Sequence, residues 1–391
     1  GGAVYATTSP VIASIGASDN IALDAMQLAY DGVWQAWEPA AGSKNIPFTG
    51  DGVHTVTLRV RDGAGNISVL YTDTIILDTT PPTGTVSINL GATYTNQPTM
   101  TLYLTATDNI SLTMMNISLD GVTWLGWETY APTKTVVFAA GDGAKVANVS
   151  FRDAAGNIVN PAVFDMIILD TVTPSSTVLS LPAVVATPFA VSWAWYGTEM
   201  SGVKCYDVQS RAGLAGAWTT WQSCAAITST DFVGDVGTTY YFRSSAIDNA
   251  GNAEAYPISP DYDASTCVDA HEPNNGSAQA AGATIGISQT NAFCLPSDVD
   301  WVRFTAQGGA KYSIAGFGIT ATFDLIAPDG VTVLATGVNS IPARTFAPGV
   351  YFVRARNTSA LIGRYDVLIQ MTQPPRMVYA PNTQRAYSAG W

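Results

Sequence analysis

The segment ASDNIALDAMQLAYDGVWQAWE, residues 17–38, is repeated as ATDNISLTMMNISLDGVTWLGWE at residues 106–128. The two copies match at a near-constant offset of 89 or 90 residues. The similarity continues through RDGAGNI from Arg61 and RDAAGNI from Arg152, and through TIILDTTPP and MIILDTVTP. The chain therefore contains an internal duplication whose unit is about 91 residues long.

A third and more diverged copy spans residues 173–264 and ends in D-x-A-G-N at 248–252. In this motif the Asp accepts hydrogen bonds from turn amides and the Gly adopts a positive φ, which predicts a hairpin between two strands. The third copy also keeps a W-x-x-W spacing, found at Trp34 and Trp37, Trp124 and Trp127, and Trp218 and Trp221.

Short stretches within each repeat alternate apolar and polar residues, as in HTVTLRVRD (54–62), TMTLYLTATD (99–108) and TYYFRSSAID (239–248). This period of two predicts strands. About seven such strands per repeat, with Pro-rich joints at 79–82 and 171–174, describe an immunoglobulin-like β-sandwich. Residues 1–264 resemble the bacterial immunoglobulin-like and fibronectin type III-like repeats of surface proteins.

The texture changes from Cys267, with Glu272-Pro273-Asn274-Asn275, then Asp298-x-Asp300-Trp301, then the strand GVYFV at 349–353. These motifs resemble the bacterial pre-peptidase C-terminal domain, a jelly-roll-like β-sandwich attached to secreted hydrolases and surface proteins. The predicted fold is therefore all-β, with tandem sandwiches. The predicted divisions are a first repeat at 1–80, a second at 81–172, a third at 173–264, the pre-peptidase-like sandwich at 265–373 and a tail at 374–391.

The resemblance to the pre-peptidase domain implies a calcium site, because oxygen ligands from both motifs bind calcium in some members. The matching residues are Asp269, Glu272, Asn274, Asn275, Asp298 and Asp300. Six to eight carboxylate and amide oxygens suit this hard cation. The alternative is that the Asp and Asn side chains cap turns and bond their own backbone. His271 interrupts the acidic spacing.

Cysteines and net charge indicate where the chain works. Cys205 and Cys224 form one local pair and Cys267 and Cys294 another, without zinc-type spacing, so two disulfides and a secreted, extracellular or cell-surface location are predicted. The formal charge of −13 argues against nucleic acid as a partner. No run of about 18 apolar residues predicts a membrane span.

No catalytic motif is present, and the chain has only two histidines, His54 and His271. The signatures of common hydrolases, zinc peptidases and nucleotide-binding proteins are absent from the sequence. The chain is therefore predicted not to be an enzyme. The repeated Trp pairs have two interpretations, which are packing within the sandwich and stacking on sugar rings.

The two ends of the sequence suggest self-assembly. At an offset of 89, Gly1 aligns with Leu90, so the first repeat lacks the segment 82–89 that opens the second. A sandwich without a strand exposes backbone and an apolar groove that accept another chain's strand. The predicted donor is the tail, through Val378, Tyr379, Tyr387 and Trp391. The alternative is a fragment of a longer surface protein with an ordinary tail.

The leading hypothesis for function is a subunit of an extracellular filament, sheath or surface layer, a homo-polymer joined head to tail through its chain ends. The alternative is an adhesin or a substrate-binding accessory region of a secreted hydrolase, with a polysaccharide or protein ligand.

Overall fold

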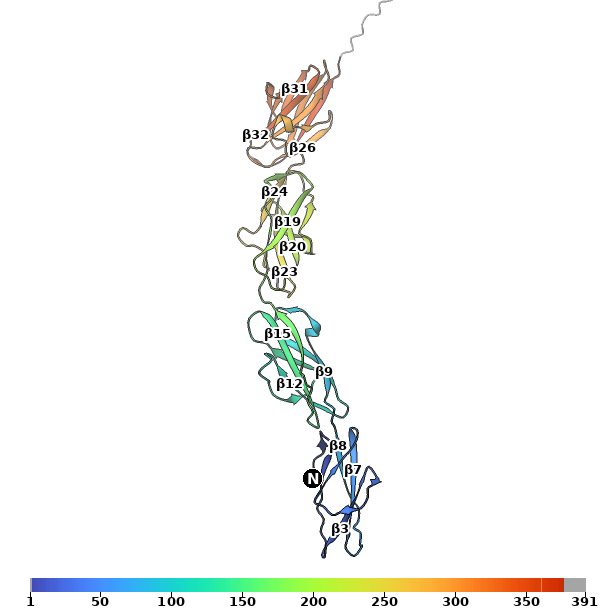
Figure 1. Cartoon of the computed structure of the whole chain (residues 1–391). Helices are drawn as coiled ribbons and strands as arrows, with labels where there is room; N and C mark the ends of the chain where they lie inside the picture. The colour runs from blue at the N-terminus through green and yellow to red at the C-terminus, as the bar shows by residue number, and fades with distance from the viewer. Residues whose placement is uncertain (1, 360, 376–391) are drawn as a thin grey trace, which may run out of the picture. The chain divides into compact units, whose positions relative to one another are not determined.

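The computed structural model describes residues 2–359 and 361–375, and in this part the chain is all-β, with four β-sandwiches in tandem (Figure 1). The chain forms two compact units that divide after Val172, except that residues 249–251 group with the first unit. Sandwiches 1 and 2 belong to the first unit and sandwiches 3 and 4 to the second. No helix of the described residues is long and apolar enough to cross a membrane.

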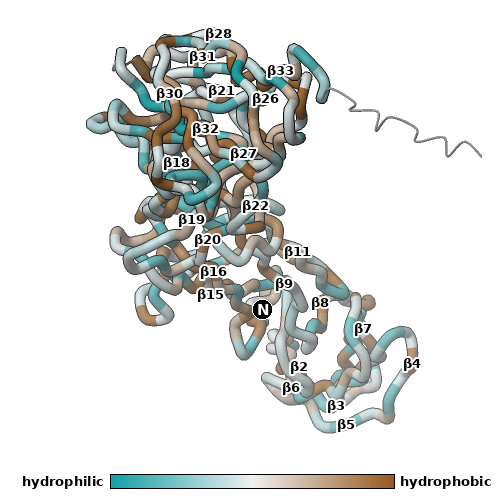
Figure 2. The backbone as a smooth tube through the Cα atoms, turned by 90° about the horizontal axis from the view of Figure 1, so that it is seen from above, coloured by the Kyte–Doolittle hydropathy of each residue, from teal (hydrophilic) through white to brown (hydrophobic). Residues whose placement is uncertain are grey.

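Sandwich 1 has one complete sheet, in the order β1-β8-β7-β3-β4 with β5 beside β3, and a second sheet of only two strands, β2 and β6, which run side by side (Figure 2). Its strands are β1 (Tyr5–Ala6), β2 (Val11–Ser14), β3 (Leu23–Tyr30), β4 (Val33–Trp34), β5 (Glu38–Pro39), β6 (Ser43–Ile46), β7 (Gly52–Asp62) and β8 (Tyr71–Leu77).

Sandwich 2 follows the same plan, with a strand, β9, that has no counterpart among the described residues of sandwich 1, and with an isolated bridge at Trp124 in place of β4. Its sheets are β10-β16-β15-β12-β13 and β14-β11-β9, so β9 extends the smaller sheet to three strands. The strands are β9 (Thr83–Ile88), β10 (Tyr94–Thr95), β11 (Thr99–Thr107), β12 (Leu112–Ser118), β13 (Glu128–Thr129), β14 (Thr133–Val137), β15 (Gly143–Asp153) and β16 (Val163–Leu169). A 3-10 turn, Asn89–Gly91, follows β9.

Sandwich 3 repeats this plan with sheets β18-β24-β23-β20-β21 and β17-β19-β22, and a disulfide joins Cys205 to Cys224. Its strands are β17 (Ser175–Val178), β18 (Val184–Val185), β19 (Phe189–Tyr196), β20 (Val203–Ala212), β21 (Thr219–Ala225), β22 (Ser229–Phe232), β23 (Thr239–Asp248) and β24 (Ala264–Val268). Because β24 pairs with β23, sandwich 3 extends to Val268 and not to the predicted boundary at 264.

Sandwich 4 consists of a five-stranded sheet, β25-β27-β32-β29-β30, and a four-stranded sheet, β26-β33-β28-β31. The second predicted disulfide, Cys267–Cys294, ties it to the last strand of sandwich 3. Its strands are β25 (Ala281–Gly282), β26 (Ser288–Phe293), β27 (Val299–Ala306), β28 (Lys311–Gly318), β29 (Ala321–Ile326), β30 (Val333–Val338), β31 (Ser340–Thr345), β32 (Gly349–Asn357) and β33 (Gly363–Gln373), with a 3-10 turn at Ser277–Gln279.

The D-x-A-G-N motif forms the predicted hairpin turn in all three repeats. In sandwich 2, one Asp153 oxygen accepts the backbone N–H groups of Gly156 at 2.6 Å and Asn157 at 2.8 Å, and the other accepts the Asn157 side-chain amide at 2.8 Å. Gly156 has a φ of 105°, which favours glycine. Asp62 and Asp248 bond the Asn four residues later in the same way.

Candidate functional site

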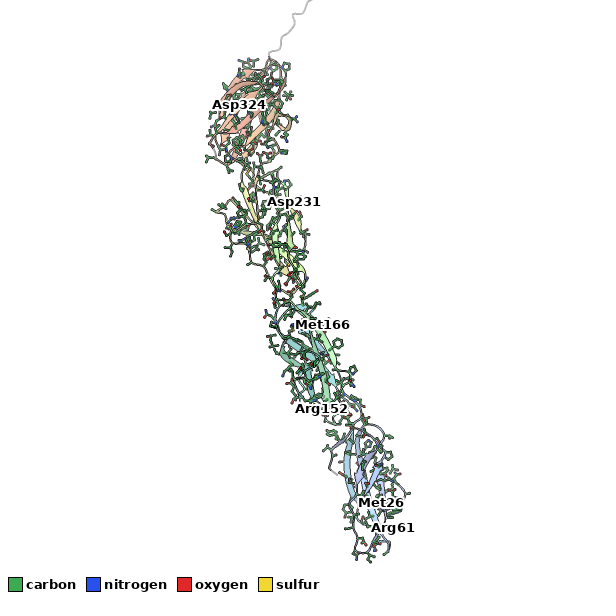
Figure 3. The ribbon with its side chains drawn as sticks, turned by 60° about the vertical axis from the view of Figure 1, so that its left-hand side comes forward. Met26, Arg61, Arg152, Met166, Asp231 and Asp324 are labelled. Atoms are coloured by element: carbon green, nitrogen blue, oxygen red, sulfur yellow. A yellow bond between two sulfur atoms is a disulfide. The ribbon has the colours of Figure 1, made fainter. Side chains whose placement is uncertain are left out.

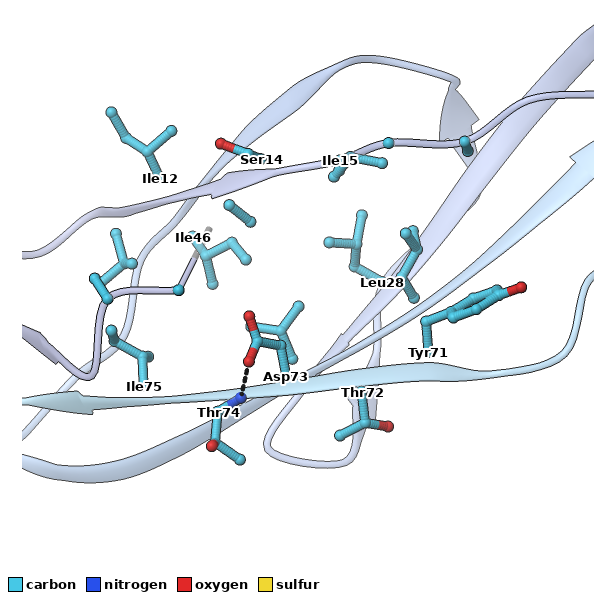
Figure 4. Close-up of a pocket in the computed structure, with 18 of the residues that line it drawn as sticks. Ile12, Ser14, Ile15, Leu28, Ile46, Tyr71, Thr72, Asp73, Thr74 and Ile75 are labelled. Atoms are coloured by element: carbon cyan, nitrogen blue, oxygen red, sulfur yellow. Dashed lines mark hydrogen bonds between the residues drawn. The ribbon is translucent and has the colours of Figure 1, made fainter.

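The first candidate is an apolar groove of about 580 Å³ on sandwich 1, between β2 and β8. Ile15, Leu28 and Ile46 point into it (Figure 4). In sandwich 2 the same space is filled by β9, which pairs with β11 and contributes Val86 and Ile88 to the core. No described strand pairs with β2 on that side in sandwich 1.

Among the described residues, no strand covers part of the inner face of sandwich 1. Ala147, Val149 and Ile167 of sandwich 2 are at most 1% exposed. Their counterparts Val56, Leu58 and Ile75, on β7 and β8, are only partly buried. Uncovered apolar surface of this kind favours binding of a further strand.

Asp73 marks where a strand's backbone would be held. Its counterpart Asp165 on β16 accepts the backbone N–H of Ile88, the last residue of β9, at 2.7 Å. In sandwich 3, Asp263 likewise accepts the N–H of Val178, the last residue of β17, at 3.0 Å. The Asp73 carboxylate projects from β8 toward the groove and accepts the N–H of Thr74 at 2.9 Å (Figure 4).

The predicted donor residues Val378, Tyr379, Tyr387 and Trp391 lie outside the residues that the structure describes. The structure therefore describes the groove that would accept a strand. Strand donation by the tail stays a prediction. Space for the strand is tight at one position in sandwich 2, because a Cβ on Gly84 would lie 2.5 Å from the Phe151 ring. The smaller Val60 replaces Phe151 in sandwich 1.

The second candidate is a buried group of carboxylates where sandwiches 3 and 4 meet. One oxygen each from Asp269, Glu272 and Asp300 lies within 4.8 Å of the others. Asp269 directly follows β24 and therefore comes from the end of sandwich 3. The prediction had placed it in the fourth domain. Asp269 and Asp300 are both 0% exposed.

Several oxygens of this group have no hydrogen-bond donor. Neither side-chain atom of Asn274, which is 0% exposed, has a partner among the described residues, and the same is true of Asp300 Oδ1. The other Asp300 oxygen accepts the Tyr365 hydroxyl at 2.5 Å. Burial, together with the neighbouring carboxylate of Asp269, raises the pKa of Asp300 to about 8. The donor set is rich in oxygen and would suit a hard cation.

The other two predicted ligands have structural contacts instead. Asp298 accepts the backbone N–H groups of Cys294 at 2.9 Å and Val299 at 3.0 Å, which is the turn-capping role. Asn275 is exposed, and its amide donates to Glu272 at 3.1 Å. The geometry thus groups Asp269, Glu272 and Asp300. The backbone carbonyl of Asn274 accepts the N–H of Trp301, the residue after Asp300, at 2.9 Å.

Arginines cover most of the W-x-x-W rings, which sequence reasoning missed. The Arg59 guanidinium lies 4.5 Å from the centre of the Trp34 ring, and that of Arg61 lies 4.9 Å from Trp37. Arg152 covers Trp127 at 4.5 Å in the same way (Figure 3 labels Arg61 and Arg152). The signal was the presence of Arg at alternate positions of β7. Such cation–π stacks stabilise the sheet surface.

Trp124 differs from its counterpart Trp34. Ser150 of β15 stands at the position of Arg59, as the pairing of β12 with β15 and of β3 with β7 shows. No cation among the described residues therefore lies over the Trp124 ring, which is 40% exposed. The Trp34 ring is exposed to almost the same extent, 39%, so the two positions differ in the stacked cation and not in exposed fraction.

His54 has a structural environment. Its ring stacks on Phe48 with centres 4.3 Å apart, and its nitrogens contact Asp31 at 2.8 Å and the Gly50 carbonyl at 2.9 Å. Burial lowers the pKa of His54, but the Asp31 carboxylate and the Gly50 carbonyl outweigh it and raise the pKa above its ordinary value. The interaction fixes the loop before β7.

Comparison with known proteins gave one curated relative and several solved structures. The chain is 27% identical over 304 residues to "Exoglucanase B" of Cellulomonas fimi; the match covers 70% of the chain and about a quarter (27%) of that protein. The fibronectin(III)-like modules of Clostridium thermocellum CbhA match 47% of the chain and 93% of that structure, with 13% identity and a TM-score of 0.31. A tetra-tandem repeat from the extending region of a large adhesion protein matches 91% and 92%, with 16% identity and a TM-score of 0.28. No known protein-family profile matches.

The two strand-holding positions give a matched pair of variants. Asp165→Ala should lower the free energy of unfolding of sandwich 2 by about 2 kcal/mol, because a hydrogen bond from Ile88 to a charged group is lost. Asp73→Ala should leave sandwich 1 nearly unchanged, because its carboxylate bonds only the adjacent amide. Calorimetric unfolding of the full chain measures both. Equal destabilisation by the two variants would show that Asp73 already holds a strand.

Proposed function

We propose that this chain is a non-catalytic accessory region of a secreted polysaccharide-degrading enzyme and that it holds the enzyme against its polysaccharide. The observation that carries the proposal is the similarity over 304 residues to an exoglucanase, of whose length the match takes up only 27%. A region of that extent leaves most of such a protein for catalysis elsewhere.

The structure supports an accessory role in two further ways. His54, one of the two histidines, contacts Phe48, Asp31 and Gly50 in a packing arrangement rather than a Ser-His-Asp geometry. Two disulfides favour an oxidising compartment outside the cell. The predicted extracellular location agrees with these disulfides.

The surface that would meet the polysaccharide is the open face of Trp124. An aromatic face binds the apolar side of a pyranose ring in the same way that it packs on other flat surfaces. Trp34, at the equivalent position of sandwich 1, is 39% exposed but has the Arg59 guanidinium stacked on its ring, and a sugar would have to displace that cation. Sandwich 2 is therefore the proposed contact with cellulose or a related β-glucan.

Binding to insoluble cellulose tests this proposal. The purified full chain should be depleted from solution by cellulose, and Trp124→Ala should reduce the bound fraction at least several-fold without lowering the unfolding temperature. Trp34→Ala serves as the matched control and should bind as the parent does. If neither cellulose nor soluble mixed-linkage β-glucan retains the parent chain, the proposed function is wrong.

We also propose that the carboxylates of Asp269, Glu272 and Asp300 hold a calcium ion, which would rigidify the end of the accessory region. The residues fit such an ion because the oxygens of Asp300 and Asn274 that lack donors would gain a ligand contact. Burial, and after it repulsion from neighbouring carboxylates, raises the pKa of Glu272 as well as that of Asp300, and the ion would offset that repulsion.

Thermal unfolding in calcium and in chelator tests the ion. Calcium at millimolar concentration should raise the unfolding temperature of the full chain by several degrees, because an ion that binds only the folded state stabilises it. Asp300→Asn should remove most of this shift, and Asp329→Asn, in an exposed turn of the same sandwich, should keep it. An identical unfolding temperature of the parent under both conditions would contradict the calcium assignment.

The groove of sandwich 1 favours a second candidate function, assembly of copies by strand exchange. An extended segment would pair with β2 and give its backbone N–H to Asp73, as Ile88 does to Asp165. Donor and acceptor would be different segments of the chain, so such contacts would be heterologous and could propagate into an open filament. The proposed donor is the segment 374–391 of a second copy.

Sedimentation and electron microscopy test the second candidate. The full chain should form filaments at micromolar concentration, whereas a chain that ends at residue 373 should remain monomeric. A synthetic peptide with the sequence of residues 81–89, which includes β9, should compete for the groove and dissolve the filaments. Monomers from the full chain at all accessible concentrations would exclude this function and leave the accessory role untouched.

A further inference from the structure

Three carboxylates meet where sandwich 1 ends and sandwich 2 begins. Asp78 directly follows β8, Asp108 directly follows β11, and Asp153 ends β15. One oxygen from each of the three lies within 4.8 Å of the others. Asp78 belongs to the last strand of sandwich 1, whereas the other two belong to sandwich 2.

Hydrogen bonds to neighbouring groups of the protein fix all three residues. The Asp78 backbone N–H donates to the Ala6 carbonyl at 2.9 Å. Asp108 Oδ2 accepts the N–H groups of Ile110 at 2.9 Å and Ser111 at 2.8 Å. Asp153 is held by its D-x-A-G-N turn, and Asn157 of that turn also donates to the Asp78 carbonyl at 2.8 Å. The carboxylates are therefore preorganised.

Two carboxylate oxygens of this cluster are buried without a hydrogen-bond donor, although Asp108 as a residue is half-buried. Asp78 is 0% exposed. Among the described residues, Asp78 Oδ2 has no hydrogen-bond partner, and Asp108 Oδ1 has none either. None of the described ion pairs includes Asp78, Asp108 or Asp153. Burial raises the pKa of Asp78, and the charges of Asp153 and Asp108 raise it further. Buried carboxylates without a partner are costly.

The first repeat shows which part of this arrangement belongs to the fold alone. Asp19 and Asp62 are the counterparts of Asp108 and Asp153, and they cap the same turns. Both are exposed or half-buried, and neither is in an acidic cluster of the described residues. The turns therefore account for the two aspartates but not for Asp78, whose addition brings a third carboxylate into a closed space.

We propose that Asp78, Asp108 and Asp153 bind one calcium ion that joins sandwich 1 to sandwich 2. The donors are all oxygens, which calcium prefers. Two ligands of one calcium ion, each at about 2.4 Å, are separated by at most about 4.8 Å, which agrees with the observed grouping. Since the ligands come from both sandwiches, the ion limits rotation about the segment Thr79–Pro82. This site is separate from the group around Asp300 and does not depend on the proposed function.

Counting bound ions in the full chain tests the proposal. The parent for this experiment is Asp300→Asn, which removes the site between sandwiches 3 and 4 from the count. Equilibrium dialysis of the chelator-treated protein against radioactive calcium gives the number of ions per chain. Asp78→Asn and Asp108→Asn, which alter opposite sides of the junction, should each lower this number by one.

Asp62→Asn is the control, because Asp62 is the counterpart in sandwich 1 of the proposed ligand Asp153. This variant should leave the number of bound ions unchanged. Circular dichroism and the unfolding temperature in chelator establish that each variant folds. A parent that binds no calcium would overturn the proposal. An equal count in the parent, Asp78→Asn and Asp108→Asn would also overturn it.

Discussion

The hydrogen bonds that Asp153 accepts within its own turn are the interaction on which the rest of this architecture depends. They close the hairpin after β15, the longest strand of sandwich 2, and so set the register of the sheet that carries the core. The same turn in sandwich 1 leaves Asp62 half-buried and outside any acidic cluster of the described residues. In sandwich 2, Asp78, which follows β8 of sandwich 1, lies close to Asp153. A residue that closes a turn of one sandwich therefore also lies beside the sandwich before it.

Repetition made much of the fold predictable from the sequence. At an offset of 89 residues no part of the given sequence aligns with β9 in the first repeat, and the described residues of sandwich 1 have no strand at that position. The two cysteine pairs followed from their local spacing. The turn motif predicted its own hydrogen bonds because they are local. These features depend on short-range patterns or on comparison of one repeat with another.

Long-range features were not accessible in this way. Nothing in the sequence singled out Asp78 or Asp108, because only the packing of two sandwiches brings these residues together. Asp269 was assigned to the fourth domain because the texture of the sequence changes at Cys267, but backbone pairing places β24 in sandwich 3. The cover of Trp34 by Arg59 depends on cross-strand neighbours, which the alternation of a strand does not specify.

All three repeats share one plan, and in the first repeat no described strand occupies the position that β9 takes in the second. Hydrogen–deuterium exchange of the full chain, at a concentration where it is monomeric, tests this most directly. The account predicts fast exchange of the amides of residues 16–18 and strong protection of the equivalent residues 105–107, which β9 covers. Equal protection of the two segments would contradict the account, because it would mean that a strand already occupies the groove.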